Sequence, residues 1–450
     1  MDPDRRKVLR MKNTPPAERL PLSRREFMLA LGGTVLGVAV GSRADAQEDD
    51  LAAFIRGTME EEGAPGFSGA IVRNDQLLWS GAFGWADMAR RTPMSPDTLQ
   101  NIGSISKTIT ATAVMQLWEE GRFQLDDDVG EVLPYDVRNP RFPDEPITFR
   151  QLLTHRSSIA DGPAYGESYA CGDPAVPLGE WIQEYLTPGG AYFNPEENFL
   201  AWKPGTLDPP TPPRPYSNVA FGLLGVLVEV LSGQSFNGFC RDRILHPLGM
   251  RETGWFLAEI DRARHAVPYS LLPEDFEPPE ISDMASLLPA ADPSPAAPAP
   301  GDLFPHCLYS FYNYPDGLLR TNVQELSRFL RAYIGGGMLN GVRILKSETI
   351  GLMLSDQHFG RGLCWSFQET PDGEPFWGHG GGDPGISTYM GFRERDKVGV
   401  IIFFNFGGSG NGMFRILERM MEEGERLAGP IHRPLSPGIS TDPFASYGAS

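Results

Sequence analysis

The chain has 450 residues, of which 41% are hydrophobic and 22% are charged, the composition of a globular protein with enough apolar residues for a large core. Its formal net charge of −19 at pH 7 makes nucleic acid and anionic membrane surfaces unfavourable partners. The charge excludes these classes of partner, but it says nothing about a reaction.

The first 46 residues are predicted to be an export signal that is not part of the fold. The segment SRREFM at residues 23–28 resembles a twin-arginine motif, a moderately apolar run covers residues 27–40, and ADA at residues 44–46 offers small residues for cleavage. The apolar run is too short and too rich in glycine to span a membrane, so we expect no stable membrane insertion after signal removal. The expected mature protein is periplasmic or secreted; an uncleaved amphipathic tail is the alternative.

One helix and two strands are predicted next. Residues 49–63 are expected to form an amphipathic helix, because apolar residues recur along one side. Residues 67–74 and 76–85 are expected to be strands joined by a tight turn at Asn74 and Asp75.

A serine then lies one helical turn before a lysine, in Ser104-Ile105-Ser106-Lys107, at the start of a helix expected to end near Gly121. Because residues three apart share a helix face, the lysine amine can lie beside the serine hydroxyl. That hydroxyl is a weak nucleophile unless a base takes its proton. A lysine can be that base if burial and nearby positive charge lower its pKa from about 10 toward roughly 7–8. Alone, the pattern also fits a helix N-cap serine followed by a solvated lysine.

Between residues 125 and 316 helical patterns alternate with loops, and the strand signal fades. Two proline-rich inserts, at residues 207–215 and 289–300, favour extended conformation and cannot continue a helix. The first insert directly precedes Tyr216, which favours a place at the rim of a cleft over an idle surface loop.

The last part of the chain returns to strands and ends with a helix. Apolar or alternating segments are expected to be strands at residues 362–369, 375–379, 386–392 and 398–405. Residues 411–427 are expected to form an amphipathic helix, and the proline- and serine-rich tail at 429–450 is expected to be loosely held.

The cysteines and histidines show no metal-binding pattern, and we expect neither a metal nor a cofactor. The seven histidines lack HxH and HExxH spacing, which disfavours a zinc hydrolase, and the absence of a GxSxG elbow disfavours an α/β-hydrolase. Four cysteines allow three full pairings, and the sequence chooses neither among these nor between disulfides and buried thiols. They are Cys171, Cys240, Cys307 and Cys364.

Two further segments favour a catalytic interpretation of the serine–lysine pair over a helix cap. Tyr216-Ser217-Asn218 precedes a helical pattern, and GHGGG at residues 378–382 opens the region of strands. In this order the three segments resemble the active-site elements of the serine β-lactamase and penicillin-binding superfamily. The tyrosine version is similar to the class C β-lactamase and D-Ala-D-Ala carboxypeptidase branch, which includes carboxylesterases. The resemblance extends over residues 50–428 through LLTHRSS at 152–158, PLGM at 247–250 and DGL at 316–318.

The resemblance implies an α+β fold of the β-lactamase/transpeptidase type, in which helices flank an antiparallel sheet and a helical domain is added. The sheet part would comprise residues 47–124 and 317–428, and the helical part residues 125–316. The site would lie in the cleft between them, a common place for ligand pockets.

The resemblance also implies a role for each motif residue. Ser104 would attack a carbonyl carbon, and Lys107 and Tyr216 would share the general-base task. Asn218 would hold Lys107 and donate a hydrogen bond to the substrate. The backbone N–H groups of Ser104 and Gly382 would form the oxyanion hole.

The third motif departs from the family's usual Lys-Thr-Gly and reads His379-Gly380-Gly381. A histidine is largely neutral near pH 7 and a glycine has no hydroxyl, which puts carboxylate binding by His379 and Gly380 in doubt. We therefore expect a serine hydrolase acting through an acyl-enzyme on a small-molecule ester or amide. The alternatives are a true β-lactamase or D-alanyl carboxypeptidase or aminopeptidase, acting on a lactam or a peptide, and a non-catalytic binding module.

Overall fold

The computed structural model describes residues 45–206, 216–271, 301, 303–358, 360–369, 375–408 and 411–428. Residues 1–44 of the predicted signal, both proline-rich inserts and the tail from residue 429 onward lie outside the described residues.

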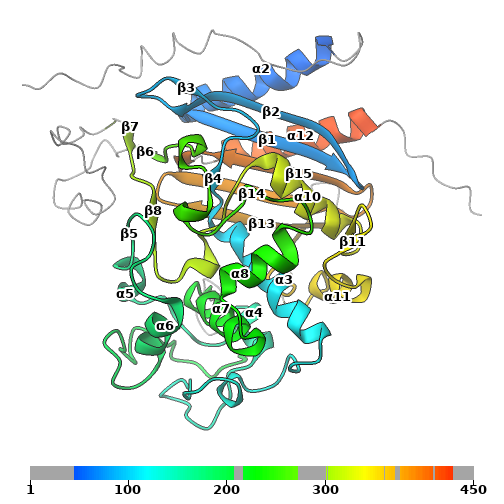
Figure 1. Ribbon diagram of the computed structural model, residues 1–450. Helices are drawn as coiled ribbons and strands as arrows, with labels where there is room; N and C mark the ends of the chain where they lie inside the picture. The colour runs from blue at the N-terminus through cyan, green and yellow to red at the C-terminus, as the bar shows by residue number, and fades with distance from the viewer. Residues whose placement is uncertain are drawn as a thin grey trace, which may run out of the picture.

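A seven-stranded antiparallel sheet joins the two ends of the described chain (Figure 1). Its strand order is β12-β13-β14-β15-β1-β2-β3, and Phe67 of the first strand pairs with Phe404 of the last long one. The positive φ of 53° at Asn74 makes the expected tight turn between the first two strands. These strands are β1 (Gly66–Arg73), β2 (Gln76–Asp87), β3 (Thr92–Pro93), β12 (Ser366–Glu369), β13 (Pro375–Asp383), β14 (Ile386–Arg393) and β15 (Val398–Phe404). The predicted α+β fold with an antiparallel sheet is confirmed, and β13 continues past the expected end at residue 379, so the GHGGG motif lies within a strand.

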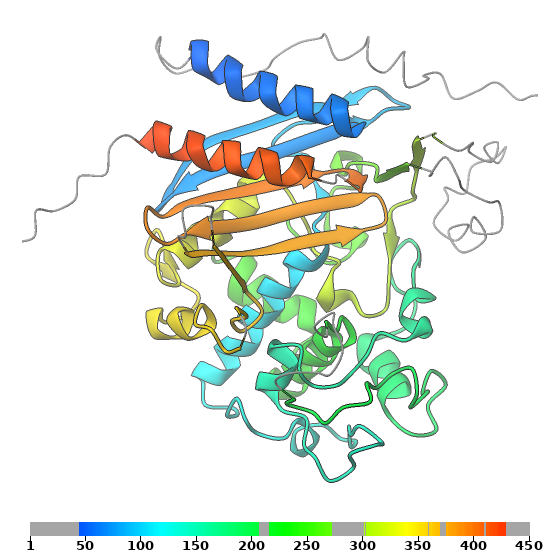
Figure 2. The same cartoon turned by 180° about the vertical axis from the view of Figure 1, so that it is seen from behind.

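Two helices from opposite ends of the chain cover one face of the sheet. α2 (Asp45–Glu62) and α12 (Gly412–Ala428) lie side by side on it (Figure 2). The side chains that they bury completely include Ile55, Met59, Ile416 and Met420. These pack into one hydrophobic cluster with residues of β1 and β15, which explains why both helices show a clear amphipathic pattern.

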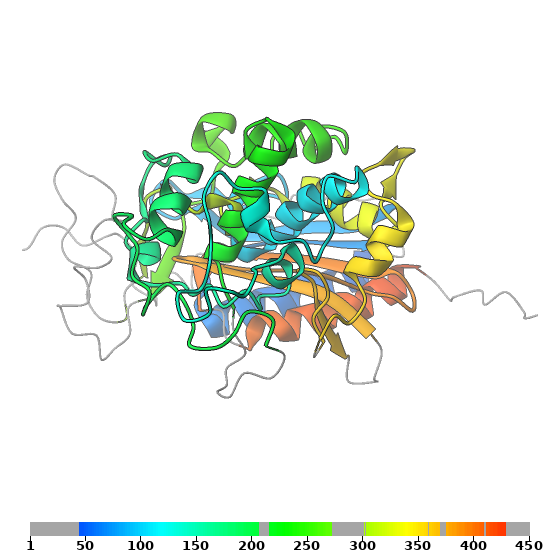
Figure 3. The ribbon, with the colours of Figure 1, turned by 90° about the horizontal axis from the view of Figure 1, so that it is seen from below.

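The opposite face carries the remaining helices (Figure 3). α10 (Val323–Ile334) packs on the sheet, and α3 (Ser106–Glu119) packs against α7 (Val219–Ser232). The other α-helices are α4 (Phe149–Leu153), α5 (Pro163–Gly166), α6 (Leu178–Leu186), α8 (Phe236–Cys240) and α11 (Ser347–Met353). Short strands link the loops here: β4 (Gln100–Asn101), β5 (Ala170–Cys171), β6 (Tyr269–Leu271), β7 (Leu303–Pro305), β8 (Tyr309–Ser310), β9 (Arg320–Thr321), β10 (Met338–Leu339), β11 (Val342–Arg343) and β16 (Phe406–Gly407).

Two glycines of α7 allow a neighbouring turn to lie directly against that helix. A Cβ at Gly222 would collide with Asn313, and a Cβ at Gly225 would collide with Pro315. The turn η8 (Tyr314–Asp316) can therefore reach the interior of the helical layer. This packing carries Asp316 toward α3.

The described helices were compared with the length and hydropathy of a membrane span. Among the described residues, no single helix is long and apolar enough to cross a membrane. One bent pair of helical segments, α7 and Phe236–Leu245, is long and apolar enough only when the two segments are counted together. The N-terminal ten residues of α7 are buried in the protein core.

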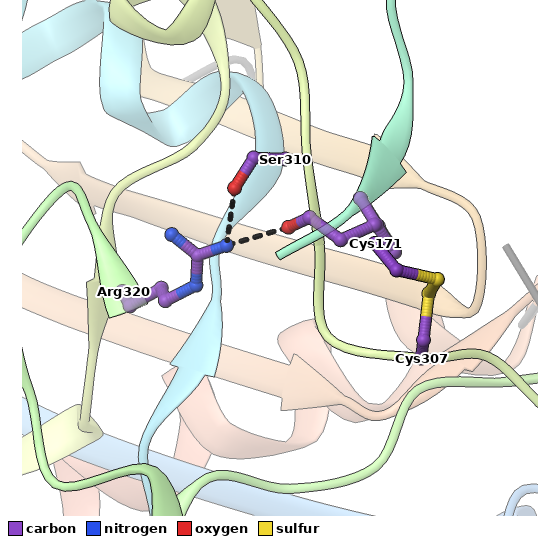
Figure 4. Close-up of a disulfide and its surroundings, with 5 residues drawn as sticks. Cys171, Cys307, Ser310 and Arg320 are labelled. Atoms are coloured by element: carbon purple, nitrogen blue, oxygen red, sulfur yellow. Dashed lines mark hydrogen bonds between the residues drawn. A yellow bond between two sulfur atoms is a disulfide. The ribbon is translucent and has the colours of Figure 1, made fainter. Parts of the chain in front are cut away.

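One disulfide joins Cys171 and Cys307 (Figure 4). Cys171 ends β5, which pairs with β8, and Cys307 lies just before β8. Buried Arg320 donates to the hydroxyl of Ser310 in β8, at 3.4 Å. The two other cysteines, Cys240 and Cys364, are buried thiols. The sequence left the pairing of the four cysteines open, and in the structure they form one disulfide and two thiols.

Candidate active site

Ser104 lies on a short 3-10 turn, η1 (Gly103–Ile105), that leads directly into α3. Gly103 has a positive φ of 53°, and its N–H donates to the side-chain oxygen of Asn101 at 2.8 Å. A Cβ at Gly103 would lie 2.8 Å from the backbone nitrogen of Gly382, so the glycine allows β13 to pass close beside the turn. The two segments expected to supply oxyanion donors, at Ser104 and Gly382, are therefore neighbours.

Lys107 connects the serine with α7. Its Nζ donates to Ser104 Oγ at 3.0 Å and to Asn218 Oδ1 at 2.7 Å. The side chain of Lys107 is fully buried. The three-residue spacing thus places serine and lysine on one face, and Asn218 meets them from the start of another helix.

An acidic residue also binds Lys107, and sequence reasoning missed its role. Asp316 accepts from Lys107 Nζ through its backbone carbonyl at 2.8 Å, and its carboxylate Oδ2 lies 3.3 Å from Nζ. The side chains of the pair are 0% and 3% exposed. Asp316 belongs to the DGL segment, which as a sequence offers no sign that its carboxylate faces the lysine.

A lysine acts as a base near neutral pH only if its pKa is lowered, and Lys107 does not meet this condition. Burial lowers the pKa of Lys107, but the acidic groups of Tyr216 and Asp316 outweigh burial, and the net pKa is raised. Because the phenol of Tyr216 is itself neutral near pH 7, the carboxylate of Asp316 is the charge that acts there. The condition of a lowered lysine pKa is therefore not met, and the ammonium form of Lys107 is favoured.

Tyr216 covers the opening beside Lys107. Its ring stacks on that of His155 at a centroid distance of 4.1 Å, and Lys107 Nζ lies 5.1 Å from the ring centroid. The residue is 41% exposed, but burial around the phenol still raises the pKa of Tyr216, against the opposing effects of Lys107 and Ser104.

A second acidic residue missed by sequence reasoning fixes Asn218. The carboxylate of Asp161 accepts from the backbone N–H groups of Asn218 and Val219, at 2.9 and 3.0 Å, where α7 begins. It also accepts from Asn218 Nδ2 at 2.9 Å. This contact turns the amide so that Oδ1 faces Lys107. Asp161 is 57 residues from Asn218, so no local pattern pairs them.

His379 of the third motif is buried and neutral. Its Nδ1 lies 2.7 Å from the carbonyl oxygen of Gly380, and since a carbonyl only accepts, Nδ1 carries the proton. Burial, followed by the charge of Lys107, lowers the pKa of His379 to about 4. The ring is thus uncharged at pH 7, as expected, and its Nε2 is an acceptor.

Gly380 leaves space beside that ring. A Cβ at Gly380 would meet Tyr389 at 3.7 Å, an ordinary contact, whereas a Cβ at Gly381 would collide with Ile102. A side chain could therefore be accommodated at position 380 and not at 381.

A cavity of about 290 Å³ brings the motifs together. The residues that line it include Ser104, His155, Tyr216, Arg361, His379 and Gly380. Lys107 binds Ser104 from the interior, and Asn218 binds Lys107. Arg361 is a cation that sequence reasoning did not identify. Within the described ranges, no group of three or more His, Cys, Asp or Glu residues is placed to hold a metal ion.

Sequence relatives match most of the chain. A family model described as Beta-lactamase matches residues 51–422. Penicillin-binding protein 4* of Bacillus subtilis (strain 168) is 26% identical over 358 residues, which cover 75% of this chain and 68% of the relative. Penicillin-binding protein 4 of Amycolatopsis lactamdurans is 27% identical over 338 residues, covering 72% and 77%.

Solved structures show the same fold. D-amino acid amidase from Ochrobactrum anthropi SV3, complexed with L-phenylalanine, aligns with a TM-score of 0.64 at 20% identity, covering 84% of this chain and 100% of that one. D-alanine carboxypeptidase AmpC from Burkholderia cenocepacia aligns with a TM-score of 0.59 at 21% identity, covering 85% and 100%. The structural neighbours show the fold, the family match indicates a serine hydrolase of the β-lactamase and penicillin-binding type, and the chain belongs to the Beta-lactamase family.

Proposed function

We propose that this protein hydrolyses esters or amides that lack an obligatory carboxylate, through an acyl-enzyme on Ser104. The observation that carries the proposal is the state of His379. A neutral ring whose free nitrogen accepts hydrogen bonds replaces a permanent cation, and Gly380 adds no hydroxyl. Such a surface favours a neutral or hydrogen-bond-donating substrate group over a carboxylate.

The geometry supports the following sequence of steps. Ser104 Oγ attacks the carbonyl carbon from the state in which the Lys107–Tyr216 pair has lost one proton. With Lys107 an ammonium, Tyr216 is then a phenolate, and it accepts the proton of Ser104. The backbone N–H groups of Ser104 and Gly382 receive the developing oxyanion, where one such donor is typically worth about 3–4 kcal/mol. The phenol then gives the proton to the leaving group, and in the second half it activates the water that releases the acyl group.

Arg361 favours a second candidate function. This cation lines the same cavity as Ser104, so a substrate carboxylate has a possible partner away from the third motif. A β-lactamase or D-alanyl peptide hydrolase would use Arg361 in this way.

Parallel assays of the mature protein separate the two functions. Short-chain p-nitrophenyl esters should exceed nitrocefin, benzylpenicillin and D-alanyl peptides in kcat/KM. Replacing His379 and Gly380 together (H379K with G380T) should shift the ratio toward the lactams by roughly ten- to a hundredfold, the effect of a gained charge-assisted hydrogen bond. The double replacement is compatible with the space at position 380.

Faster hydrolysis of penicillins than of every ester by the unmodified protein would contradict the proposal. Arg361→Ala then identifies the second function, since it should reduce activity on carboxylate substrates and leave neutral esters little changed.

The assignment of the nucleophile has its own test. A fluorophosphonate probe should label Ser104, and Ser104→Ala should abolish labelling. Labelling at Ser106 instead would remove Ser104 from the mechanism, and a folded protein without any labelling would favour a binding module.

The proposal includes export. It is supported by the twin arginines and the small residues at 44–46. The protein from its native host should begin near Gln47 by mass spectrometry, and Arg24→Lys with Arg25→Lys should block export. An intact leader in the cytoplasm would contradict it.

A further inference from the structure

Asp316 is the centre of a buried polar cluster that extends away from the cavity. Besides Lys107, its carboxylate accepts from Asn313 Nδ2 at 2.8 Å and from the Tyr165 hydroxyl at 3.0 Å. Asp316 is 2% exposed, and the cluster lies behind the residues that line the cavity. These contacts hold the carboxylate in place, with Oδ2 directed at the lysine.

The cluster continues to the end of β13. The Tyr165 hydroxyl lies 3.4 Å from that of Tyr169, which donates to Asp383 Oδ1 at 2.8 Å. Asn101 donates to the other oxygen of Asp383 at 3.2 Å and accepts from Gly103 N–H. The chain of contacts thus runs from Lys107 to the turn that carries Ser104.

Several charged and titratable groups surround Asp316 and affect its pKa. Facing it are one cation and four acidic groups, namely Lys107, Asp161, Tyr165, Tyr169 and Asp383. Burial raises the pKa of Asp316 to about 6, with Lys107 opposing the rise. The carboxyl is therefore ionised at neutral pH, and the cation in contact with it is Lys107.

We propose that Asp316 is a positioning residue, the buried counter-ion that keeps Lys107 an ammonium and thereby assigns the proton of Ser104 to Tyr216. This inference rests on the proposed function, since it concerns how the same serine is activated. An ion pair buried this deeply is stabilised by its geometry and its additional hydrogen bonds, and here both carboxylate oxygens have such donors. Among the described residues that line the cavity there is no Asp or Glu, and Tyr216 carries a negative charge only once it has lost its proton.

The pH dependence of Ser104 reactivity tests the inference without knowledge of the natural substrate. The rate of labelling by a fluorophosphonate is measured from pH 6 to pH 12, because the pKa values of Lys107 and Tyr216 are both raised, and its midpoint reports deprotonation of the Lys107–Tyr216 pair. An opposite charge at this distance typically shifts a pKa by 1–3 units. Asp316→Asn removes a negative charge that favours the protonated pair, so the midpoint should move to lower pH by at least about one unit.

Two variants control for a merely structural effect. Glu325→Gln removes another buried carboxylate, one that accepts from Arg251 N–H and Thr253 Oγ1 away from the site. It should reduce thermal stability and leave the midpoint in place. Tyr165→Phe removes one hydrogen bond to the same carboxylate, so it should shift the midpoint in the direction of Asp316→Asn by a smaller amount.

The outcomes separate this inference from the proposed function. If the wild-type protein is not labelled at Ser104, the proposed function fails. If it is labelled and Asp316→Asn keeps the wild-type midpoint or raises it, only the role of Asp316 fails. An equal shift in Glu325→Gln would also overturn the inference. If Asp316→Asn does not fold, Tyr165→Phe decides, and an unshifted midpoint in that variant contradicts the role.

Discussion

The two faces of the central sheet differ in what they bury. Under α2 and α12 most of the buried side chains are hydrophobic and pack in one cluster. On the cleft side, the turn before α3 and the end of β13 enclose an ammonium, carboxyls and phenols within one network of hydrogen bonds. A buried polar group left without a partner costs roughly 1–3 kcal/mol, so that network persists only while each member keeps its partners.

The comparison indicates that one face of the sheet contributes mainly to stability and the other mainly to reactivity. Hydrophobic burial of about 25 cal/mol per Å² makes the outer face a source of stability. The cleft face instead holds charges in fixed positions at a cost in desolvation, which the stability from elsewhere offsets. Changes on the outer face should therefore affect unfolding, and changes on the cleft face should affect reactivity.

The largest effect is expected from the proton-handling pair of the cleft. Lys107→Ala and Tyr216→Phe should each lower kcat by about 10²- to 10⁴-fold, the usual range for acid–base groups. Because residues that act as a unit are not additive, the double variant should be little worse than the poorer single variant. Steady-state kinetics on a p-nitrophenyl ester measure this. Near wild-type turnover in Tyr216→Phe would remove the tyrosine from the mechanism.

The outer face provides the opposite case. Met420 is fully buried between α12 and the sheet, and Met420→Ala should lower the free energy of unfolding by about 2–5 kcal/mol. Denaturant unfolding measures the loss, and kcat at 25 °C should stay unchanged while the variant is folded. A kcat that falls together with stability would show that the two faces are not independent.

The smallest effect is expected from the titration of Asp383, a carboxyl group of the cleft network. Burial, followed by the charge of Asp316, raises the pKa of Asp383 to about 7 in the folded protein, compared with about 3.9 in an unfolded chain. A raised carboxyl pKa contributes stability below pH 4 that is lost as the pH rises toward 7. Asp383→Asn removes this titration. Its Tm relative to wild type should therefore be higher at pH 8 than at pH 5, by roughly 2–4 °C. A Tm difference that is constant with pH would mean that Asp383 is ionised throughout.

Much of the fold follows from patterns within a few residues. The short, almost continuously buried apolar runs of β1, β14 and β15 and the apolar side of α12 depend on neighbours up to four positions away, so they were predictable. The same is true of Ser104 and Lys107, because three residues of helix geometry place the amine beside the hydroxyl. The neutrality of His379 also followed from the residue type and was reinforced by burial.

The electrostatics of the site depended on the tertiary structure. The charge of Lys107 depends on burial and on its acidic neighbours Tyr216 and Asp316, of which Asp316 is 209 residues away along the chain, and the orientation of Asn218 depends on Asp161. Likewise, the pairing of Cys171 with Cys307 spans 136 residues, so nothing local selects it. The sequence determined which groups carry the chemistry, whereas the fold decided their charge, because Coulomb energy depends on distance in space and on burial, neither of which is encoded by spacing along the chain.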